Sequence, residues 1–276
     1  MVDTVTLPGG KIAYTEQGAG PPVVFVHGLL VNANLWRKVV PLVADAGFRC
    51  LAPTLPLGAH QLPMAADADL TPPGLAKLID DFLAALDLTD VTIVANDSGG
   101  ALTQILMANH PARVGRVVLT PCDAFEEFFP KPFDDLTRMI RRPGAPWLLS
   151  RALQLPAVQR LPNSFGWLAK HGIPDEIMAA YLRPCRDSPA IRRDLKRFLI
   201  GVNSRHTVAA AEKLPAFTKP VLLVRATEDK IFRASLFDRL AAVLPDARLV
   251  EVADSWTFVS EDQPAELARL IVDFAS

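Results

Sequence analysis

Residues 91–100 read Val-Thr-Ile-Val-Ala-Asn-Asp-Ser-Gly-Gly, and they require a strand to turn into a helix almost without a loop. Residues 91–95 form a short apolar run rich in β-branched side chains, which is typical of a buried strand. From Gly99 onward, apolar residues recur at helical spacing. The residue at such a corner has a strained backbone, so the residues two positions away on either side must be small. Ala95 and Gly99 flank Asp97 in this way, and the pattern predicts a nucleophile elbow with Asp97 at its apex.

Two other interpretations of this corner remain open from these residues alone. Ser98 would be the apex if the strand ran one residue further, but it is flanked by Asn96 and Gly100, and Asn96 is bulkier than Ala95. Asp97 would otherwise be a helix N-cap, a position where aspartate is common. The rest of the chain has to decide between these roles.

Strands and helices alternate on both sides of this corner. Strands are expected at residues 4–7, 11–17, 22–27, 48–53, 116–121, 221–225 and 248–252, and helices at 35–46, 71–86, 234–244 and 264–274. Thr71, which precedes two prolines, is expected to cap the second of these helices. Such alternation predicts an α/β fold with a mostly parallel sheet and helices on both faces. Between about 124 and 214 the strands stop, which predicts an inserted helical cap. The expected organisation is core 1–123, cap 124–214 and core 215–276.

Charge and cysteine content narrow the expected partners and location. The net charge of −1 gives no sign of a nucleic-acid or anionic-membrane partner, and no apolar run approaches membrane-spanning length. No signal peptide is visible at the start, and three cysteines without metal-type spacing indicate reduced thiols. We therefore expect a cytoplasmic protein with a small-molecule partner and neither a metal nor a cofactor; a homodimer stays open.

Four motifs in this order resemble the α/β-hydrolase superfamily over essentially the whole chain. They are the strand that ends at His27-Gly28, the elbow at Asp97, the cap insertion, and the tail. In the tail, Thr227-Glu228-Asp229-Lys230-Ile231-Phe232 is similar to the loop that carries the triad acid, which implies that role for Asp229. The stretch 258–264 is similar to the segment that follows the catalytic histidine. Together these motifs favour the nucleophile over the cap as the role of Asp97.

Aspartate at the elbow resembles the haloalkane dehalogenase and epoxide hydrolase branch. In that branch the resemblance implies that the carboxylate attacks an sp³ carbon and forms an alkyl-enzyme ester. A histidine then activates the water that hydrolyses the ester. The attack itself needs no base, because a carboxylate is already ionised at neutral pH, and the positive end of the following helix favours the ionised form.

The chain departs from that branch at the positions that handle the leaving group and water. Thr257 stands where the catalytic histidine is expected, Ser98 stands where dehalogenases have a halide-binding tryptophan, and Leu29 stands where they have a halide-binding asparagine. Epoxide opening uses two cap tyrosines, and only Tyr181 lies in the expected cap. Standard alkyl-halide and epoxide chemistry are both disfavoured by these departures.

Several side chains remain candidates around Asp97. The backbone amides of Leu29 and Ser98 are expected to form an oxyanion hole. Asp229 should lie near Thr257. Without an imidazolium between them, Asp97 and Asp229 would raise each other's proton affinity; the alternative is that Asp229 only binds Thr257 and loop amides.

Three further residues have weaker signals. His60 is the candidate to replace the missing base, because it follows a strand at the carboxyl-end rim of the sheet, although an exposed loop histidine is the simpler alternative. Asp123 resembles an alternative acid position of some dehalogenases, displaced by about two residues, and a turn-forming or capping aspartate competes with that role. Trp256 is a packing residue or lines the pocket mouth.

These observations lead to two hypotheses. The first is a cofactor-independent hydrolase that acts on a small, largely apolar substrate through the Asp97 carboxylate in a cap-covered pocket, with Asp97 as nucleophile or base. The second is a triad-depleted protein on the same scaffold, either a ligand-binding module or a non-hydrolytic lyase or cyclase, since a fold does not fix a function.

Overall fold

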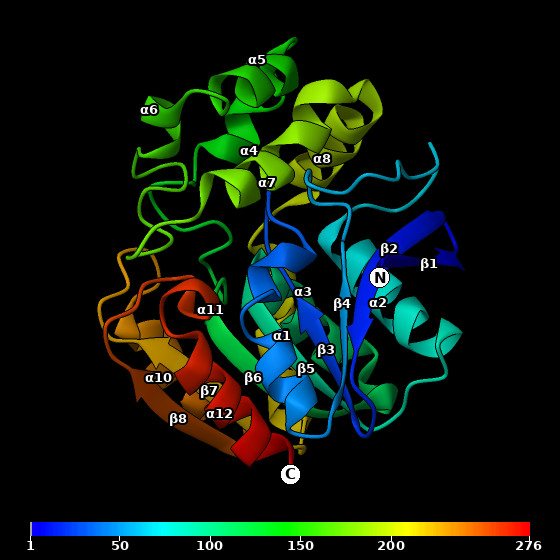
Figure 1. Cartoon of the computed structure of the whole chain (residues 1–276), viewed down its shortest axis with the longest axis vertical. Coiled ribbons are helices and arrows are strands. Elements are labelled where there is room, and N and C mark those ends of the chain that lie inside the picture. The colour runs from blue at the N-terminus through cyan, green and yellow to red at the C-terminus, as the bar shows by residue number, and fades with distance from the viewer. Residues whose placement is uncertain (1) are drawn as a thin grey trace.

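An eight-stranded sheet in the order β1-β2-β4-β3-β5-β6-β7-β8 carries the fold (Figure 1). The structure is a computed structural model that describes residues 2–276. The strands are β1 Val2–Leu7, β2 Gly10–Gln17, β3 Pro22–Val26, β4 Arg49–Pro53, β5 Val91–Asp97, β6 Val114–Cys122, β7 Val221–Ala226 and β8 Ala247–Val252. β2 pairs antiparallel with β1 and β4, and the strands from β4 to β8 are parallel. The expected mostly parallel sheet is confirmed.

Helices cover both faces of this sheet. The core helices are η1 Ala33–Trp36, α1 Val40–Asp45, α2 Pro72–Ala85, α3 Ser98–Asn109, η2 Pro111–Arg113, α10 Ala234–Val243, α11 Val259–Asp262 and α12 Pro264–Ala275. α1 packs with α12 in front of the sheet in the view of Figure 1, whereas α2 packs with α3 on the opposite face. Thr71 caps α2 by accepting a hydrogen bond from the amide of Gly74, as expected from the sequence.

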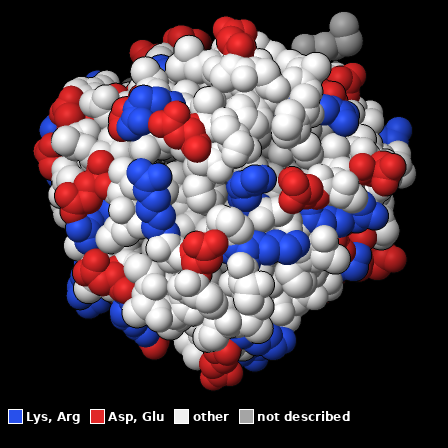
Figure 2. All heavy atoms as spheres, turned by 90° about the horizontal axis from the view of Figure 1, so that it is seen from below, with Lys and Arg blue, Asp and Glu red and all other residues white. Residues whose placement is uncertain are grey.

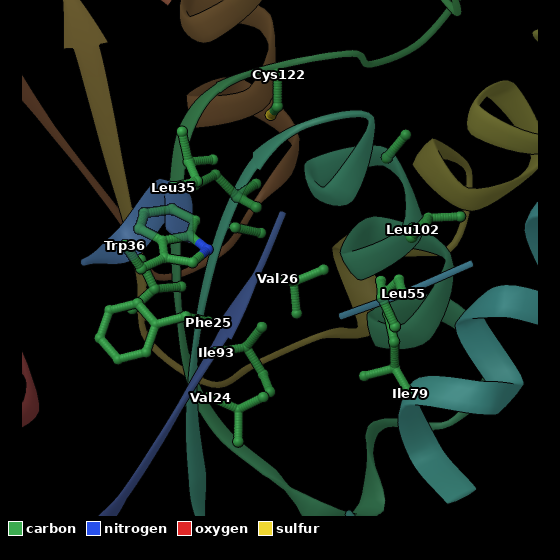
Figure 3. Close-up of a cluster of buried hydrophobic side chains, with 14 of the residues drawn as sticks. Val24, Phe25, Val26, Leu35, Trp36, Leu55, Ile79, Ile93, Leu102 and Cys122 are labelled. Carbon is green, nitrogen blue, oxygen red and sulfur yellow. The ribbon is translucent and has the colours of Figure 1, made fainter. Parts of the chain in front are cut away.

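The core lies on both sides of the central strands. Phe25 of β3 packs against Trp36, with ring centroids 5.4 Å apart. The neighbouring residues of the strand point to the other face, toward Leu55, Ile79 and Leu102 (Figure 3). Residues 98–107 of α3 are all buried, because the helix lies between the sheet and α2. The elbow is therefore built into the most buried part of the molecule.

The inserted segment forms a separate layer of helices above the carboxyl ends of the strands (Figure 1). Its helices are α4 Leu136–Met139, α5 Ala145–Ala152, α6 Pro156–Gln159, α7 Asp175–Asp187, α8 Pro189–Gly201, α9 Arg205–Ala211 and η3 Leu214–Ala216. α9 differs from the others because it packs against α3 of the core. We keep the boundaries 124 and 214 for the cap as a proposal.

One expected helix is divided in the structure. Residues 35–46 were expected to form one helix, but a 3₁₀ turn ends at Trp36 and α1 begins at Val40. Pro41 lies in the first turn of α1. Proline has no N–H to continue an earlier helix but suits a helix start, which explains the break.

Candidate active site

Asp97 lies at the corner where β5 meets α3, with no loop residue between them. Its backbone has φ 55° and ψ −136°, a strained conformation for a residue with a side chain. Its side chain makes no capping hydrogen bond to α3. Geometry therefore favours the elbow over the N-cap interpretation. Ser98 is fully buried and its hydroxyl lies 3.4 Å from Asp97 Oδ2, with no histidine bonded to it.

The loop after β3 directs its amide at the Asp97 carboxylate. The Leu29 N–H donates to Asp97 Oδ2 at 3.0 Å. This close approach needs glycines, because a Cβ at Gly28 would lie 2.0 Å from Asp97 Oδ2 and one at Gly99 would lie 2.5 Å from the His27 carbonyl oxygen. Burial raises the pKa of Asp97 above its ordinary value, while hydrogen bonds from Ser98 and Leu29 oppose that rise. The two expected oxyanion donors thus both act on Asp97 itself.

His27 holds the shape of this loop. The Leu55 N–H donates to His27 Nε2 at 2.8 Å, so the ring proton lies on Nδ1, which donates to the Gly28 carbonyl oxygen at 2.8 Å. Burial lowers the pKa of His27 to about 4, which keeps the ring neutral. His27 therefore braces the loop through both ring nitrogens.

Asp229 and Thr257 form a hydrogen-bonded pair at the ends of β7 and β8. Thr257 Oγ1 lies 3.0 Å from Asp229 Oδ1 and 3.2 Å from Oδ2, and the amides of Ile231 and Phe232 donate to Oδ1 at 2.7 and 3.0 Å. Burial raises the pKa of Asp229 to about 6, and the charge of Asp97 adds to this rise. The Thr257 hydroxyl thus lies beside the Asp229 carboxyl, and the charge of Asp97 raises the pKa of Asp229, whereas Asp229 is not among the causes of the raised pKa of Asp97. The hydrogen bonds of the non-catalytic alternative are also present, so the geometry is compatible with both roles.

Asp123 is a buried carboxyl without a hydrogen-bond partner. It has no exposed surface, and neither side-chain oxygen is bonded within residues 2–276. Burial raises its pKa well above the ordinary value, and the charge of Asp97 adds to the effect. A neutral carboxylic acid is the expected form. Neither a turn nor a cap accounts for its side chain.

An apolar pocket opens from Asp97 toward the cap. It is lined by Leu29, Leu30, Asp97, Phe129, Pro130, Phe133, Leu136, Leu149, Leu153, Asn163, Ser164, Phe165, Leu168, Ile231 and Phe232. Asp97 is the one charged residue among these fifteen. Ten of them, from Phe129 to Leu168, belong to the inserted segment. The pocket therefore presents a single carboxylate within a mostly apolar lining.

Of the eight predicted site residues, only Asp97 and Leu29 line this pocket, and His60 and Trp256 make contacts of other kinds. His60 is 3% exposed and therefore not an exposed loop histidine; its Nε2 lies 3.4 Å from Asp194 Oδ2 of α8, and Gly58 N–H donates to its Nδ1 at 3.3 Å. Trp256 has Lys230 Nζ 3.5 Å from its ring centroid. Neither residue is among those that line the pocket, and neither is any other histidine.

Sequence reasoning missed the residues that tie the site together. Asn96 Nδ2 lies within 3.0 Å of the Thr120 hydroxyl and of the carbonyl oxygens of Pro121 and Thr257, so it joins β5 and β6 to the loop after β8. Asp262 accepts the amides of Lys170, His171 and Trp256 at 2.9 to 3.0 Å. The sequence signal for Asn96 was its polar side chain within a mostly apolar strand. No local sequence feature indicated the role of Asp262.

Residues 2–276 contain no group of three or more His, Cys, Asp or Glu side chains arranged to hold a metal ion. Within the same range no helix is long and apolar enough to cross a membrane. The three cysteines, Cys50, Cys122 and Cys185, are free and buried.

Comparisons with known proteins agree on the architecture. A family model described as alpha/beta hydrolase fold matches residues 21–264. Haloalkane dehalogenase 2 of Mycobacterium tuberculosis is 27% identical over 277 residues, covering 96% of this chain and 91% of that protein. A cis-3-alkyl-4-alkyloxetan-2-one decarboxylase of Shewanella oneidensis is 28% identical over 284 residues, covering 96% of this chain and 85% of that protein. The crystal structure of haloalkane dehalogenase DatA from Agrobacterium tumefaciens has a TM-score of 0.82 at 22% identity, covering 100% of this chain and 96% of that chain, a likeness of fold.

Proposed function

Since the chain belongs to the α/β-hydrolase fold family and resembles its haloalkane dehalogenase-like branch, we propose that it is a cofactor-independent hydrolase whose Asp97 carboxylate attacks carbon. The observation that carries this proposal is the strained Asp97 corner, with Oδ2 held by the Leu29 amide and the side chain open to an apolar pocket. Oδ1 is then the attacking atom. In the resulting ester Oδ2 becomes the carbonyl oxygen, and it already lies at its donors.

The pocket favours substrates whose leaving group stays attached to the molecule. Leu29 contributes an apolar side chain to the lining, and the hydroxyl of Ser98 faces Asp97, so neither position offers a side-chain donor to a departing halide. Opening of a strained lactone at the carbon that bears the ester oxygen relieves this need, because ring strain assists departure and the carboxylate released needs no proton donor. We therefore propose a small, apolar, strained lactone as the substrate class.

Breakdown of the ester is the slow step in this proposal. No histidine lines the pocket, and Thr257 cannot take a proton from water at neutral pH. Asp229, with its pKa raised to about 6, is the remaining group near Asp97 that titrates close to neutrality. An alkyl ester on Asp97 should consequently persist long enough to be detected.

Intact-protein mass spectrometry tests this proposal. After incubation with a panel of epoxides, β-lactones and alkyl halides, wild type should gain the mass of one ring-opened substrate, located at Asp97 by peptide mapping. Asp97→Asn should gain none. Thr257→His should shorten the lifetime of the adduct, whereas Thr257→Val, which has a similar size and no base, should not. Absence of any adduct or turnover across the panel with wild type would overturn the proposal.

A second candidate is a lyase that needs no water-activating base. The missing imidazole favours it, and the name of the Shewanella oneidensis relative specifies a four-membered lactone with two alkyl groups. Asp97 would attack the ring carbon that bears the ester oxygen, which breaks that C–O bond and frees a carboxylate. Loss of CO₂ would then send its C–C electron pair into a new C=C bond while the Asp97 ester bond breaks and the carboxylate is regenerated.

Product analysis separates the two candidates. A disubstituted β-lactone would give a β-hydroxy acid by hydrolysis but an alkene and CO₂ by the lyase route, and ¹⁸O from labelled water would reach the hydroxyl of the β-hydroxy acid over repeated turnovers. A cytoplasmic location and a homodimer remain predictions that these experiments do not address.

A further inference from the structure

The outer end of the cap exposes apolar side chains to an unusual degree. Eight large hydrophobic residues are exposed within residues 2–276, and five of them lie between 139 and 161: Met139, Trp147, Leu148, Leu155 and Leu161. Leu148 is 62% exposed and Trp147 is 53% exposed. α5 lies at the end of the molecule opposite the C-terminus (Figure 1). We use the name cap crown for Met139, Arg142, Trp147, Leu148 and Arg151.

The same end carries positive charge that is not neutralised locally. Residues 136–165 contain five arginines (138, 141, 142, 151 and 160) and no acidic residue. Within the described chain, Arg142, Arg151 and Arg160 have no ion-pair partner. Arg151 instead lies over the Trp147 ring, 5.8 Å from its centroid. The charge of Arg151 helps to lower the pKa of Asp187, but Asp187 forms its ion pair with Arg186.

The opposite end of the molecule carries charges of both signs (Figure 2). Figure 2, which views the protein from below, shows Lys and Arg side chains interspersed with Asp and Glu. The face seen in Figure 2 carries charges of both signs, whereas the charged residues among 136–165 of the cap are all basic.

The cap crown adjoins the Asp97 pocket. A shallow groove on its surface is lined by Met139, Arg142, Trp147 and Leu148, and also by Leu136 and Leu149. Leu136 and Leu149 line the Asp97 pocket as well. The groove and the pocket therefore share two apolar lining residues.

We propose that the cap crown docks on the surface of an anionic lipid bilayer, with Trp147 and Leu148 in the interfacial region and Arg142 and Arg151 at the headgroups. Exposed tryptophan and leucine beside unpaired arginine are the features that place a helix in a lipid interface. A bilayer supplies both an apolar layer and negative charge. The proposal of docking rests on the side chains of the cap crown alone. The idea that docking delivers an apolar substrate to the Asp97 pocket rests in addition on the proposed function.

Other occupants match these features less well. A second copy in a two-fold contact would place the arginines of one crown against those of the other. A nucleic acid would satisfy the arginines but would leave Trp147 and Leu148 without an apolar partner. Our sequence-based expectation of no membrane partner came from the net charge of −1, which averages the basic cap with the rest of the chain.

Vesicle flotation with the full-length protein tests the proposal. Wild type should float with vesicles of phosphatidylcholine and phosphatidylglycerol, should not float with phosphatidylcholine alone, and should lose binding as NaCl is raised. The Arg142→Gln/Arg151→Gln double variant should bind on the order of 25-fold more weakly, at about fivefold for each arginine. Trp147→Ser/Leu148→Ser should lose at least about tenfold, because two apolar side chains no longer enter the lipid.

Matched controls keep the test specific. Leu42→Ser and Arg248→Gln change an exposed leucine and an exposed, unpaired arginine outside the cap, and they should bind like wild type. Asp97→Asn should also bind like wild type, so docking is scored independently of catalysis. The proposal is overturned if wild type ignores anionic vesicles, if the controls lose as much binding as the crown variants, or if Trp147→Ser/Leu148→Ser converts a dimer to a monomer in sedimentation without a change in flotation.

Discussion

At the scale of single residues, the structure concentrates carboxyl groups where their charge is least stable. Asp97, Asp123 and Asp229 each have a raised pKa, burial being the largest cause, and the charge of Asp97 raises the pKa of the other two. Groups with perturbed pKa values beside a pocket are typical of functional sites, where stability is given up for chemistry.

We expect Asp97→Asn to abolish adduct formation while leaving the free energy of unfolding unchanged or increased. Asparagine keeps the shape and tolerates a positive φ, and it removes a partly desolvated charge. Chemical denaturation and intact-mass measurements check both halves. A loss of about 1 kcal/mol with unchanged chemistry would instead support a structural role for the carboxylate.

Asp229 should make stability depend on pH. Its folded-state pKa is raised to about 6, above the unfolded value, so the folded protein binds the proton more tightly than the unfolded chain does. The contribution of Asp229 to the free energy of unfolding is therefore largest below pH 4 and is lost as the pH rises through 6. Asp229→Asn should therefore match wild type near pH 4 and be more stable by on the order of 3 kcal/mol at pH 7, since the pKa is raised from 3.8 to about 6 and each unit corresponds to about 1.4 kcal/mol. Urea unfolding at both pH values measures the difference, and equal gains at pH 4 and pH 7 would contradict it.

At the scale of elements, the site depends on how closely the loop after β3 approaches the start of α3. Gly28 and Gly99 permit that approach, and His27 fixes the loop from its other side. The Leu29 amide reaches Asp97 only because these backbones nearly touch.

Gly28→Ala should separate the two elements. The added Cβ would lie 2.0 Å from Asp97 Oδ2, so the carboxylate must move away from the Leu29 amide. We expect adduct formation at Asp97 to be lost and the free energy of unfolding to fall by about 1–3 kcal/mol, as for other overpacked sites. Gly201→Ala, whose Cβ would meet its nearest atom at 3.1 Å, is the control. Normal adduct formation in Gly28→Ala would show that the amide contact is dispensable.

At the scale of the whole molecule, the cap is attached to the core through α8 and the loop after β4. Asp194 of α8 is fully buried, accepts the Met64 amide at 2.8 Å and lies 3.4 Å from His60 Nε2. Burial raises the pKa of Asp194, but hydrogen bonds from His60, Met64 and Arg193 together bring it below its ordinary value. His60 thus belongs to the junction between cap and core.

Asp194→Ala should loosen this junction. It leaves the Met64 amide and His60 Nε2 without their partner, which we expect to cost about 1–3 kcal/mol and to speed proteolysis within residues 54–70. Asp187→Ala removes an exposed carboxylate that pairs only with its neighbour Arg186, and it should change stability little. Equal protease resistance in Asp194→Ala and wild type would mean that the cap is held elsewhere.

The sequence by itself determined the features whose causes lie within about ten residues. Small residues around Asp97, Thr71 before two prolines, and alternation of apolar runs predicted the elbow, the cap of α2 and the parallel sheet, because local sterics and hydrogen bonds decide them. Pro41 also carried a local signal, which the single expected helix over residues 35–46 overlooked.

Only the tertiary structure decided which polar groups meet. Asn96 reaches Thr257, His60 reaches Asp194, and Asp262 reaches the amides of Lys170 and His171, in each case across more than 90 residues of sequence. Nothing local distinguishes such residues from surface ones, since long-range contacts depend on how the layers pack. The same holds for charge: a net value of −1 is a property of the composition, whereas the basic cap crown exists only because folding places its arginines together and the acids elsewhere.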